Sequence, residues 1–176
     1  MSVAPRYFPH YTIVDHAQWK GDRELIDSVA IPMTPSPCDP QDRFVSRLAR
    51  MIGKQIEAGG CWFDVYANLD WIICDDTVIR SHLMLVCGDQ PQRHLERTPQ
   101  LVVEVLSGST RSQDLTVKRT LFLHNKVPHY LVVDRDELNC LHVTDASELS
   151  AGVDQSNEIQ LDSACDIQMT VSRLLD

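Results

Sequence analysis

Three side chains within one short stretch carry the clearest chemistry in this sequence: Glu104, Asp114 and Lys118. Glu104 lies inside the apolar run LVVEV, which is typical of a strand buried on both faces. A buried carboxylate needs a cation, a metal or hydrogen-bond donors, because an unpaired charge in the interior strongly destabilises the fold. Asp114 and Lys118 are four residues apart, so on a helix they share one face. A strand acid followed by an acid and a lysine on the next helix therefore indicates a site.

The turn between these elements, residues 107–110, consists of small and polar residues. Such a turn can cap a helix, and the free amide groups at a helix N-terminus can also bind a phosphate. Each feature has a second interpretation. Glu104 and Lys118 could form a buried ion pair that only fixes the strand. Asp114 and Lys118 could form an i,i+4 helix pair that contributes about 0.3–0.5 kcal/mol.

A long helix is the most clearly bounded element near this stretch. Asp39-Pro40 is a typical helix start and Gly59-Gly60 a typical stop. The helix between them has an apolar stripe for the core and, beside it, a basic ridge. The basic ridge is either a solvated face or a surface that contacts phosphates. The apolar stripe consists of Phe44, Leu48, Met51, Ile52 and Ile56, and the basic ridge of Arg43, Arg47, Arg50 and Lys54.

Strand patterns surround the long helix in the sequence. RELIDSVAIPM predicts a short hairpin with Asp27-Ser28 at the turn, where a positive φ at Ser28 would cost about 1 kcal/mol. Residues 61–87 predict strands around a turn at Asp75-Asp76, and HYLVVD predicts another buried strand. The length of 176 residues fits a single domain over residues 1–176, with an irregular tail at residues 1–10.

The overall charge and hydropathy exclude several classes of protein. Sixteen basic and 25 acidic residues give a formal net charge of -9, which argues against a protein that coats nucleic acid non-specifically. A local basic site stays possible, because salt screens distant charges. No apolar run approaches the roughly 20 residues that span a bilayer, and the N-terminus lacks an apolar leader. We expect a cytoplasmic protein that does not bind membranes.

The cysteines show no recognisable pairing pattern. None belongs to a C-x-x-C pair, and several lie in strand-like apolar runs, where a free thiol behaves as a small hydrophobe. We therefore expect reduced core residues rather than a disulfide framework or a zinc site. The six are Cys38, Cys61, Cys74, Cys87, Cys140 and Cys165.

Several longer strings resemble the Uma-two family of restriction endonuclease-like proteins, a branch of the PD-(D/E)XK nuclease superfamily. They are RELID, TPSP before the long helix, DDTVIRSHLMLVC and LVVEVLSGSTRSQDLTVKRTLFLHNKVPHYLVVD, so the resemblance extends roughly from Tyr11 to Val143. It implies a mixed α/β (α+β) fold of the restriction endonuclease type: a central mixed β-sheet flanked by helices, with an N-terminal hairpin and a long helix.

The resemblance also implies metal-dependent hydrolysis of DNA phosphodiester bonds, with Mg²⁺ or Mn²⁺ as the cofactor. Glu104 matches the strand acid that holds the metal, and Glu24 matches a further, accessory acid. Lys118 matches the family's catalytic lysine, moved from the strand to the following helix, and Asp114 matches the acid one turn ahead of it.

The sequence departs from the family at Ser81-His82, where the family pattern has Pro-Asp. An imidazole is a poor substitute for a carboxylate toward Mg²⁺, whereas Mn²⁺ tolerates nitrogen better. His82 is thus either a metal ligand or a core histidine with satisfied nitrogens. We predict an endonuclease with altered or lost activity. The alternative is a catalytically inactive nuclease-fold protein that serves as a nucleic-acid-binding or assembly module.

A homodimer is expected, because the late strands offer edges that need covering.

The predicted site has three parts. The predicted catalytic residues are Glu104, Lys118, Asp114 and His82; the predicted metal ligands are Glu104, His82 and Glu24; and the predicted phosphate-binding residues are Arg43, Arg47, Arg50, Lys54, Ser107 and Ser109.

Overall fold

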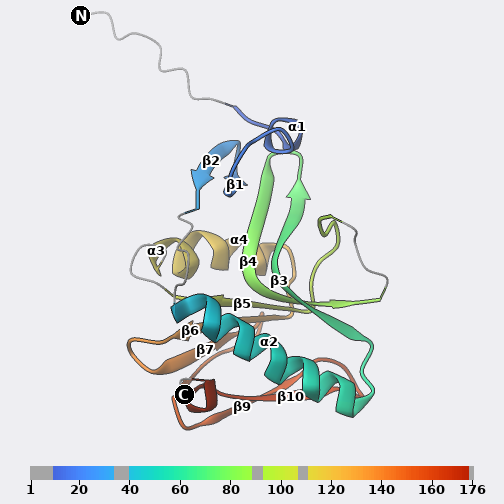
Figure 1. The fold of residues 1–176 in the computed structure, drawn as a ribbon, viewed down its shortest axis with the longest axis vertical. Coiled ribbons are helices and arrows are strands. Elements are labelled where there is room, and N and C mark those ends of the chain that lie inside the picture. Colours follow the sequence, from blue (N-terminus) through green and yellow to red (C-terminus); the bar gives the residue numbers. More distant parts are fainter. Residues whose placement is uncertain (1–9, 34–39, 89–92, 107–110, 175–176) are drawn as a thin grey trace, which may run out of the picture.

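A computed structural model describes residues 10–33, 40–88, 93–106 and 111–174 of the chain (Figure 1). The strands are β1 (Arg23–Ile26), β2 (Val29–Pro32), β3 (Phe63–Cys74), β4 (Thr77–Cys87), β5 (Leu101–Val105), β6 (His129–Asp134), β7 (Asn139–Val143), β8 (Glu148–Gly152), β9 (Ser156–Gln160) and β10 (Asp166–Thr170). The helices are α1 (Ile13–His16), α2 (Pro40–Gly59), α3 (Arg111–Gln113), the π-helical segment η1 (Asp114–Lys118), α4 (Arg119–His124) and the 3₁₀ turn η2 (Val171–Leu174). Residues 1–9 of the predicted tail, which was residues 1–10, lie outside the described residues.

The first eight strands form one mixed sheet. Its strand order is β2-β1-β4-β5-β6-β7-β8, and β3 pairs with β4 beside this path. Strands β5 and β6 are parallel, and the other neighbouring pairs are antiparallel. Helix α2 packs on one face of the sheet, and α4 packs on the other. The predicted architecture, a central mixed sheet flanked by helices, is confirmed.

Strand β5 shows how the two faces of the sheet differ. Leu101, Val103 and Val105 belong to the core under α2, whereas Val102 belongs to the core under α4. Because side chains alternate along a strand, Glu104 points to the same face as Val102. All of β5 is buried, as its continuous apolar pattern predicted.

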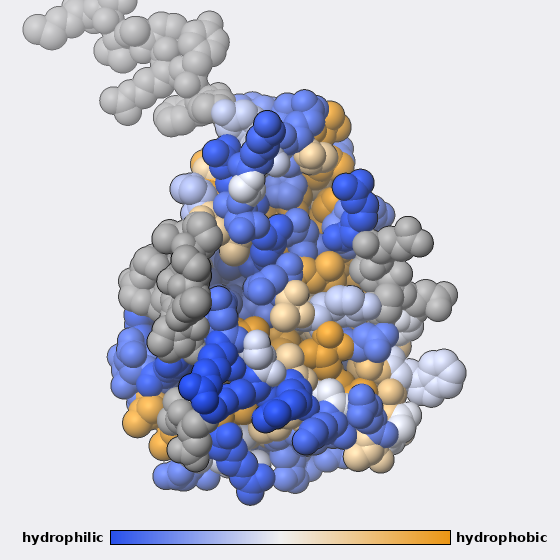
Figure 2. All heavy atoms as spheres, viewed as in Figure 1, coloured by the Kyte–Doolittle hydropathy of each residue, from blue (hydrophilic) through white to orange (hydrophobic). Residues whose placement is uncertain are grey.

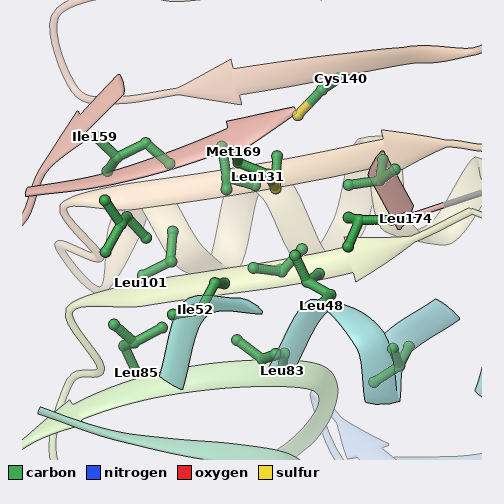
Figure 3. Close-up of a cluster of buried hydrophobic side chains, with 14 of the residues drawn as sticks. Leu48, Ile52, Leu83, Leu85, Leu101, Leu131, Cys140, Ile159, Met169 and Leu174 are labelled. Carbon is green, nitrogen blue, oxygen red and sulfur yellow. The ribbon is translucent and has the colours of Figure 1, made fainter. Parts of the chain in front are cut away.

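Helix α2 begins and ends close to the predicted positions. Its apolar stripe lies against the sheet, with Leu48 and Ile52 fully buried among strand residues (Figure 3). Asp39, the predicted cap, lies outside the described residues. On the basic ridge, Arg47 is partly buried and donates from Nη1 to the carbonyl oxygen of Leu174 at 3.2 Å. The other members of the ridge, Arg43, Arg50 and Lys54, are exposed.

The two predicted tight turns are both present. Asp27 and Ser28 join β1 to β2 with φ values of 48° and 66°, which confirms the left-handed backbone expected at Ser28. Asp75 and Asp76 join β3 to β4. Within the described residues, no helix has the length and apolar character needed to cross a membrane.

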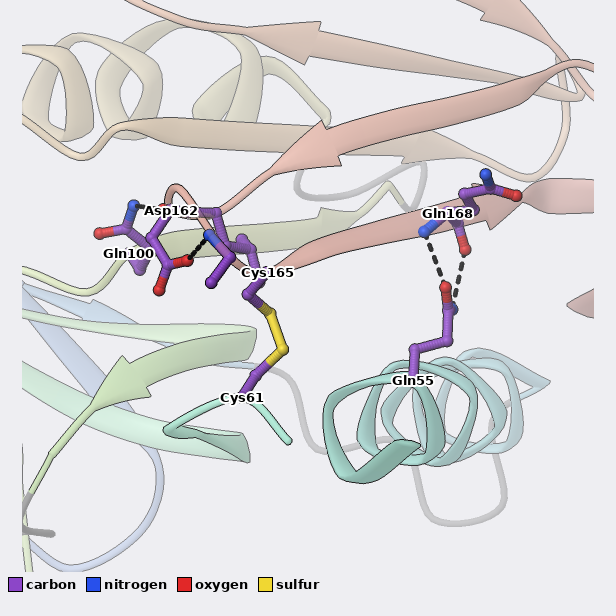
Figure 4. Close-up of a disulfide and its surroundings, with 8 residues drawn as sticks. Gln55, Cys61, Gln100, Asp162, Cys165 and Gln168 are labelled. Atoms are coloured by element: carbon purple, nitrogen blue, oxygen red, sulfur yellow. Dashed lines mark hydrogen bonds between the residues drawn. A yellow bond between two sulfur atoms is a disulfide. The ribbon is translucent and has the colours of Figure 1, made fainter. Parts of the chain in front are cut away.

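Strands β9 and β10 form a separate two-stranded sheet, which the sequence indicated only as edge structure. Ile159, Ile167 and Met169 from this small sheet are buried in the core under α2. The amide of Gln55 in α2 makes two hydrogen bonds with the main chain of Gln168: it donates to the carbonyl oxygen at 2.9 Å and accepts from the nitrogen at 2.8 Å (Figure 4). The small sheet therefore closes the core instead of extending the large one.

A disulfide joins Cys61, just after α2, to Cys165, just before β10 (Figure 4). The prediction of six reduced core cysteines is therefore wrong for this pair, and Cys74 and Cys87 are exposed rather than buried. Cys140 is free and buried as expected, and Cys38 lies outside the described residues. The pair escaped prediction because its members are 104 positions apart, and the apolar pattern around each cysteine says nothing of its partner.

Candidate active site

The structure brings five of the predicted site residues together at the junction of β1, β4, β5 and η1. Lys118 is at the centre: its Nζ lies 2.9 Å from Glu24 Oε1, 3.0 Å from Glu104 Oε1 and 3.5 Å from Asp114 Oδ1. We call these three acids and Lys118 the carboxylate cluster. All four side chains are buried. His82, the fifth residue, contacts Glu104 from β4.

The π-helical winding of η1 places both of its charged ends inside the protein. Asp114 and Lys118 are its first and last residues, and both are buried. The hydroxyl of Tyr130 on β6 donates to the main-chain oxygen of Asp114 at 2.9 Å, which anchors the start of the segment. Short π-helical segments inside α-helices are frequent at functional sites. The wider turn keeps both charges directed toward the cluster.

Both ring nitrogens of His82 are engaged. Nδ1 faces Glu104 Oε2, and Nε2 lies 2.6 Å from the amide nitrogen of Gln41 in the first turn of α2. The same Gln41 nitrogen donates to the carbonyl oxygen of Val105 at 2.7 Å, which fixes the orientation of the amide. His82 Nε2 therefore accepts a hydrogen bond. Nδ1 lies against Glu104 Oε2 and also 3.3 Å from the main-chain nitrogen of Val105; the shorter contact with Glu104 assigns the ring proton to Nδ1.

The ionisation of the cluster reflects a surplus of acids over cations. Burial alone would raise the pKa of Glu104, but Lys118 and His82 outweigh burial and lower this pKa to about 2. The pKa of Glu24 is raised, because burial outweighs its contact with Lys118 and no histidine assists. Burial would lower the pKa of Lys118, yet the surrounding carboxylates raise it. Glu104 and Lys118 thus form the charged pair at the centre.

The pKa of His82 is raised, because the attraction of Glu104 outweighs the effect of burial. A second proton would enter at Nε2, where Gln41 now donates, so protonation would break the Gln41 hydrogen bond. The two contacts of His82 therefore favour different charge states.

The donor set does not fit a divalent metal in this arrangement. Glu104 Oε1 is occupied by Lys118 and Oε2 by His82. Mg²⁺ requires a nearly octahedral set of oxygen ligands, which an imidazole and a lysine do not supply. Across the described ranges, no three His, Cys, Asp or Glu side chains are grouped so that they could hold a metal ion. The ligand roles of Glu104, His82 and Glu24 stay predictions.

The predicted phosphate-binding residues occupy a different place. The basic ridge lies along α2, and the same helix carries Gln41 at its start, where it meets His82. In the view of Figure 2, strongly hydrophilic side chains gather over the region of α2. Ser107 and Ser109 lie outside the described residues.

Sequence reasoning missed two residues of the site. Gln41 was missed because the residues around a helix start do not indicate its contacts with His82 and Val105, which lie 41 and 64 positions later in the chain. Arg80 takes part through its main chain: its nitrogen donates to Glu24 Oε1 at 3.0 Å and its carbonyl oxygen accepts from Lys118 Nζ at 3.3 Å. Main-chain contacts of this kind do not depend on the type of residue, so no sequence pattern could have predicted them.

Comparison with known proteins places this geometry in context. A family model named Uma2, described as "Putative restriction endonuclease", matches residues 11–172. The chain is also similar to the crystal structure of a "putative nuclease belonging to DUF820" from Anabaena variabilis. The TM-score is 0.77 and the identity 12%, over 93% of this chain and 97% of that one, which demonstrates a shared fold. No curated protein matches the chain.

Proposed function

Because the chain belongs to the Uma2 family, we propose that it is a DNA-binding nuclease-fold protein whose cleavage site is closed by its own side chains. The observation that carries this proposal is the state of Glu104. One carboxylate oxygen contacts Lys118 and the other contacts His82, so both are already in use. A divalent ion would have to displace an ammonium or an imidazole before it reached the acid that the family uses.

The position of His82 makes this closure stable. A carboxylate there would add negative charge and repel Glu104, which favours a cation between the two acids. The imidazole instead donates a hydrogen bond to Glu104, and Gln41 secures the other side of the ring. The substitution thus replaces a cation-binding pair of acids with a hydrogen bond between an imidazole and a carboxylate.

The DNA-binding part of the proposal rests on α2. Arg43, Arg50 and Lys54 are exposed, and within the described parts of the chain they have no acidic partner. Over a screening length of about 8 Å, such a cluster can attract phosphates despite the net charge of -9. The ridge is on the same helix as Gln41, whose amide contacts His82, so the first turn of α2 links the ridge to the site.

A second candidate is a metal-dependent endonuclease, and one observation favours it. Three carboxylates, those of Glu24, Glu104 and Asp114, face a single ammonium. Such a cluster attracts cations, and Mn²⁺ accepts nitrogen ligands more readily than Mg²⁺. In that case Lys118 would contribute by stabilising negative charge that develops on the phosphoryl group.

A supercoiled-plasmid nicking assay separates the two candidates. Wild type, His82→Asp, Glu104→Ala and the double variant are each incubated with Mg²⁺ and with Mn²⁺. The proposal expects no nicking by wild type with either ion, and nicking by His82→Asp that disappears when Glu104→Ala is added. Nicking by wild type with Mn²⁺ that is lost in Glu104→Ala would overturn the closed-site proposal in favour of the endonuclease.

DNA binding is tested separately, by fluorescence anisotropy of a labelled duplex over a range of salt. Loss of the three exposed ridge cations in an Arg43→Gln/Arg50→Gln/Lys54→Gln variant should reduce the slope of log affinity against log salt by about 0.9 per lost contact. The control variant is Lys20→Gln/Lys126→Gln, since both lysines are exposed and lie away from α2. Equal slopes for wild type and the ridge variant would refute the role of α2.

A further inference from the structure

A cavity of about 680 Å³ lies between α1, β3, β4 and residues 93–96. Residues 93–96 are held beside β3, because Leu95 exchanges main-chain hydrogen bonds of 2.8 Å with Asp70 and Ile72. No member of the carboxylate cluster lines the cavity, and neither His82 nor the basic ridge does. Its volume falls in the range of about 300–1,000 Å³ that is typical of small-ligand sites.

One wall of the cavity is aromatic and is already fixed in place. The ring of Trp19 makes edge contacts with Tyr11 and with His16, each at a centroid distance of 5.2 Å. The Arg23 guanidinium carbon lies 5.9 Å from the Trp19 ring centroid. Val78 of β4, which is 1% exposed, adds an aliphatic surface. An apolar ring entering the cavity would therefore find stacking and dispersion partners without a large rearrangement.

The charged side chains around the cavity are unevenly paired, and Glu96, which also lines it, contacts His94 at 2.9 Å. The Arg80 side chain is neutralised by Asp70, at 2.6 and 3.0 Å, and by Asp22. By contrast, Arg23 and Arg93 have no acidic partner anywhere in the described ranges. Two guanidinium groups that make no ion pair within the described ranges therefore line one cavity, in a chain of net charge -9. A guanidinium group binds phosphate through paired hydrogen bonds, better than a point charge would.

We propose that this cavity binds a nucleotide, with the base against the Trp19 wall and the phosphate on Arg23 and Arg93. Aromatic stacking combined with arginine contacts to phosphate is the chemistry that recognises unpaired nucleotides. A free mononucleotide and one nucleotide of a single strand present the same two groups. The cavity therefore accepts this chemistry from either source, and the experiment distinguishes them.

Arg80 connects the cavity to the carboxylate cluster. The Arg80 side chain lines the cavity, while its main-chain nitrogen and oxygen contact Glu24 and Lys118. A strand with one nucleotide in the cavity would consequently run close to the cluster. The proposal does not depend on cleavage or on binding along α2, because it uses different side chains.

Isothermal titration of the full chain tests the proposal, with AMP, ribose 5-phosphate and a short oligothymidylate as probes. The variants are Arg23→Gln and Arg93→Gln, and the control is Arg173→Gln, whose side chain is exposed and does not line the cavity. We expect one AMP or one oligonucleotide per chain, with affinity reduced about tenfold or more by each cavity variant, as befits the loss of a charge-assisted hydrogen bond. The control should bind like wild type.

Each outcome has a definite meaning. Binding of AMP identifies the free mononucleotide as a ligand, and binding of the oligonucleotide alone identifies a strand. Ribose 5-phosphate that binds as tightly as AMP would overturn the proposal, since the base would then contribute nothing. Absence of binding, or binding that both cavity variants leave unchanged, would also overturn it. Oligonucleotide binding that persists in the α2 triple variant keeps this result separate from the proposed function.

Discussion

Replacement of Lys118 by methionine is the most direct perturbation of the carboxylate cluster. Methionine keeps much of the volume of the side chain but removes the charge that three acids share. Lys118 Nζ lies within 3.5 Å of Glu24, Glu104 and Asp114, all of which are buried. Without the ammonium these carboxylates face one another in the protein interior, where a carboxylate is ionised only at a large energetic cost.

The expected loss follows from the pKa of Glu104. Its fall from 4.5 to about 2 on folding corresponds to about 3 kcal/mol, part of which comes from His82. Removal of one partner from a buried ion pair typically costs about 3–5 kcal/mol. We therefore expect Lys118→Met to reduce the free energy of unfolding at neutral pH by about 3 kcal/mol, or Tm by about 6–12 °C for a chain of this size.

The loss should also depend on pH. Because the pKa of Glu104 is lowered in the folded wild type, its contribution is complete above the unfolded value of 4.5 and declines as the pH falls toward 2. In Lys118→Met the acids protonate more readily, so the two proteins should converge in stability below about pH 4. Urea unfolding at several pH values measures this difference.

A matched control is Lys126→Met, since that lysine is 79% exposed and lies 4.0 Å from Asp145. It should leave the free energy of unfolding nearly unchanged at every pH. A Lys118→Met protein as stable as wild type at neutral pH would refute the assignment of Lys118 as the counter-charge of the cluster. A loss of stability that is the same at pH 7 and at about pH 2 would attribute the effect to packing instead.

Three further predictions concern parts of the chain outside the cluster. Cys61→Ser should lower the free energy of unfolding by about 2–5 kcal/mol, because a cross-link over 104 positions restricts the unfolded chain; urea unfolding with and without reductant measures it. Burial lowers the pKa of both His129 and His142, whose rings are in contact, so the free energy of unfolding should fall as the pH drops below about 6.5. His142→Gln should weaken this fall. Thermal unfolding at several pH values measures it, and an unchanged pH profile would contradict the prediction. Leu138 has a φ of 53°, and its side chain is 42% exposed. Leu138→Gly should therefore raise Tm by relieving about 1 kcal/mol of backbone strain, and a fall in Tm would contradict this prediction.

Local chemistry made much of the cluster predictable from the sequence. A single acid in the apolar run of β5 had to be buried and paired, and the spacing of Asp114 and Lys118 placed both on one side of the following helix. The limits of α2 followed from Pro40 and the two glycines after residue 58. These inferences succeed because strand burial, helix periodicity and helix ends are decided by neighbours in the sequence.

What escaped prediction depends on contacts between distant residues. Gln41 meets His82 and Val105 only after α2 has packed on the sheet, and Cys61 meets Cys165 only after the small sheet has closed the core. The role of Arg80 rests on main-chain atoms that every residue shares. No residue type, spacing or periodicity encodes such contacts, because they are produced by the tertiary arrangement as a whole.

The Cys61–Cys165 bond closes residues 61–165 into a covalent ring. We call the residues before Cys61 the N-terminal arm and the residues after Cys165 the C-terminal arm. Most of the cluster belongs to the ring, whereas Glu24 and Gln41 come from the N-terminal arm. A single backbone cut within the ring would leave the chain covalently connected until the disulfide is reduced, whereas a cut in the N-terminal arm would leave two pieces joined only by noncovalent contacts. The N-terminal arm also supplies one acid and the amide that secures His82, so the cluster is complete only where this arm and the ring dock.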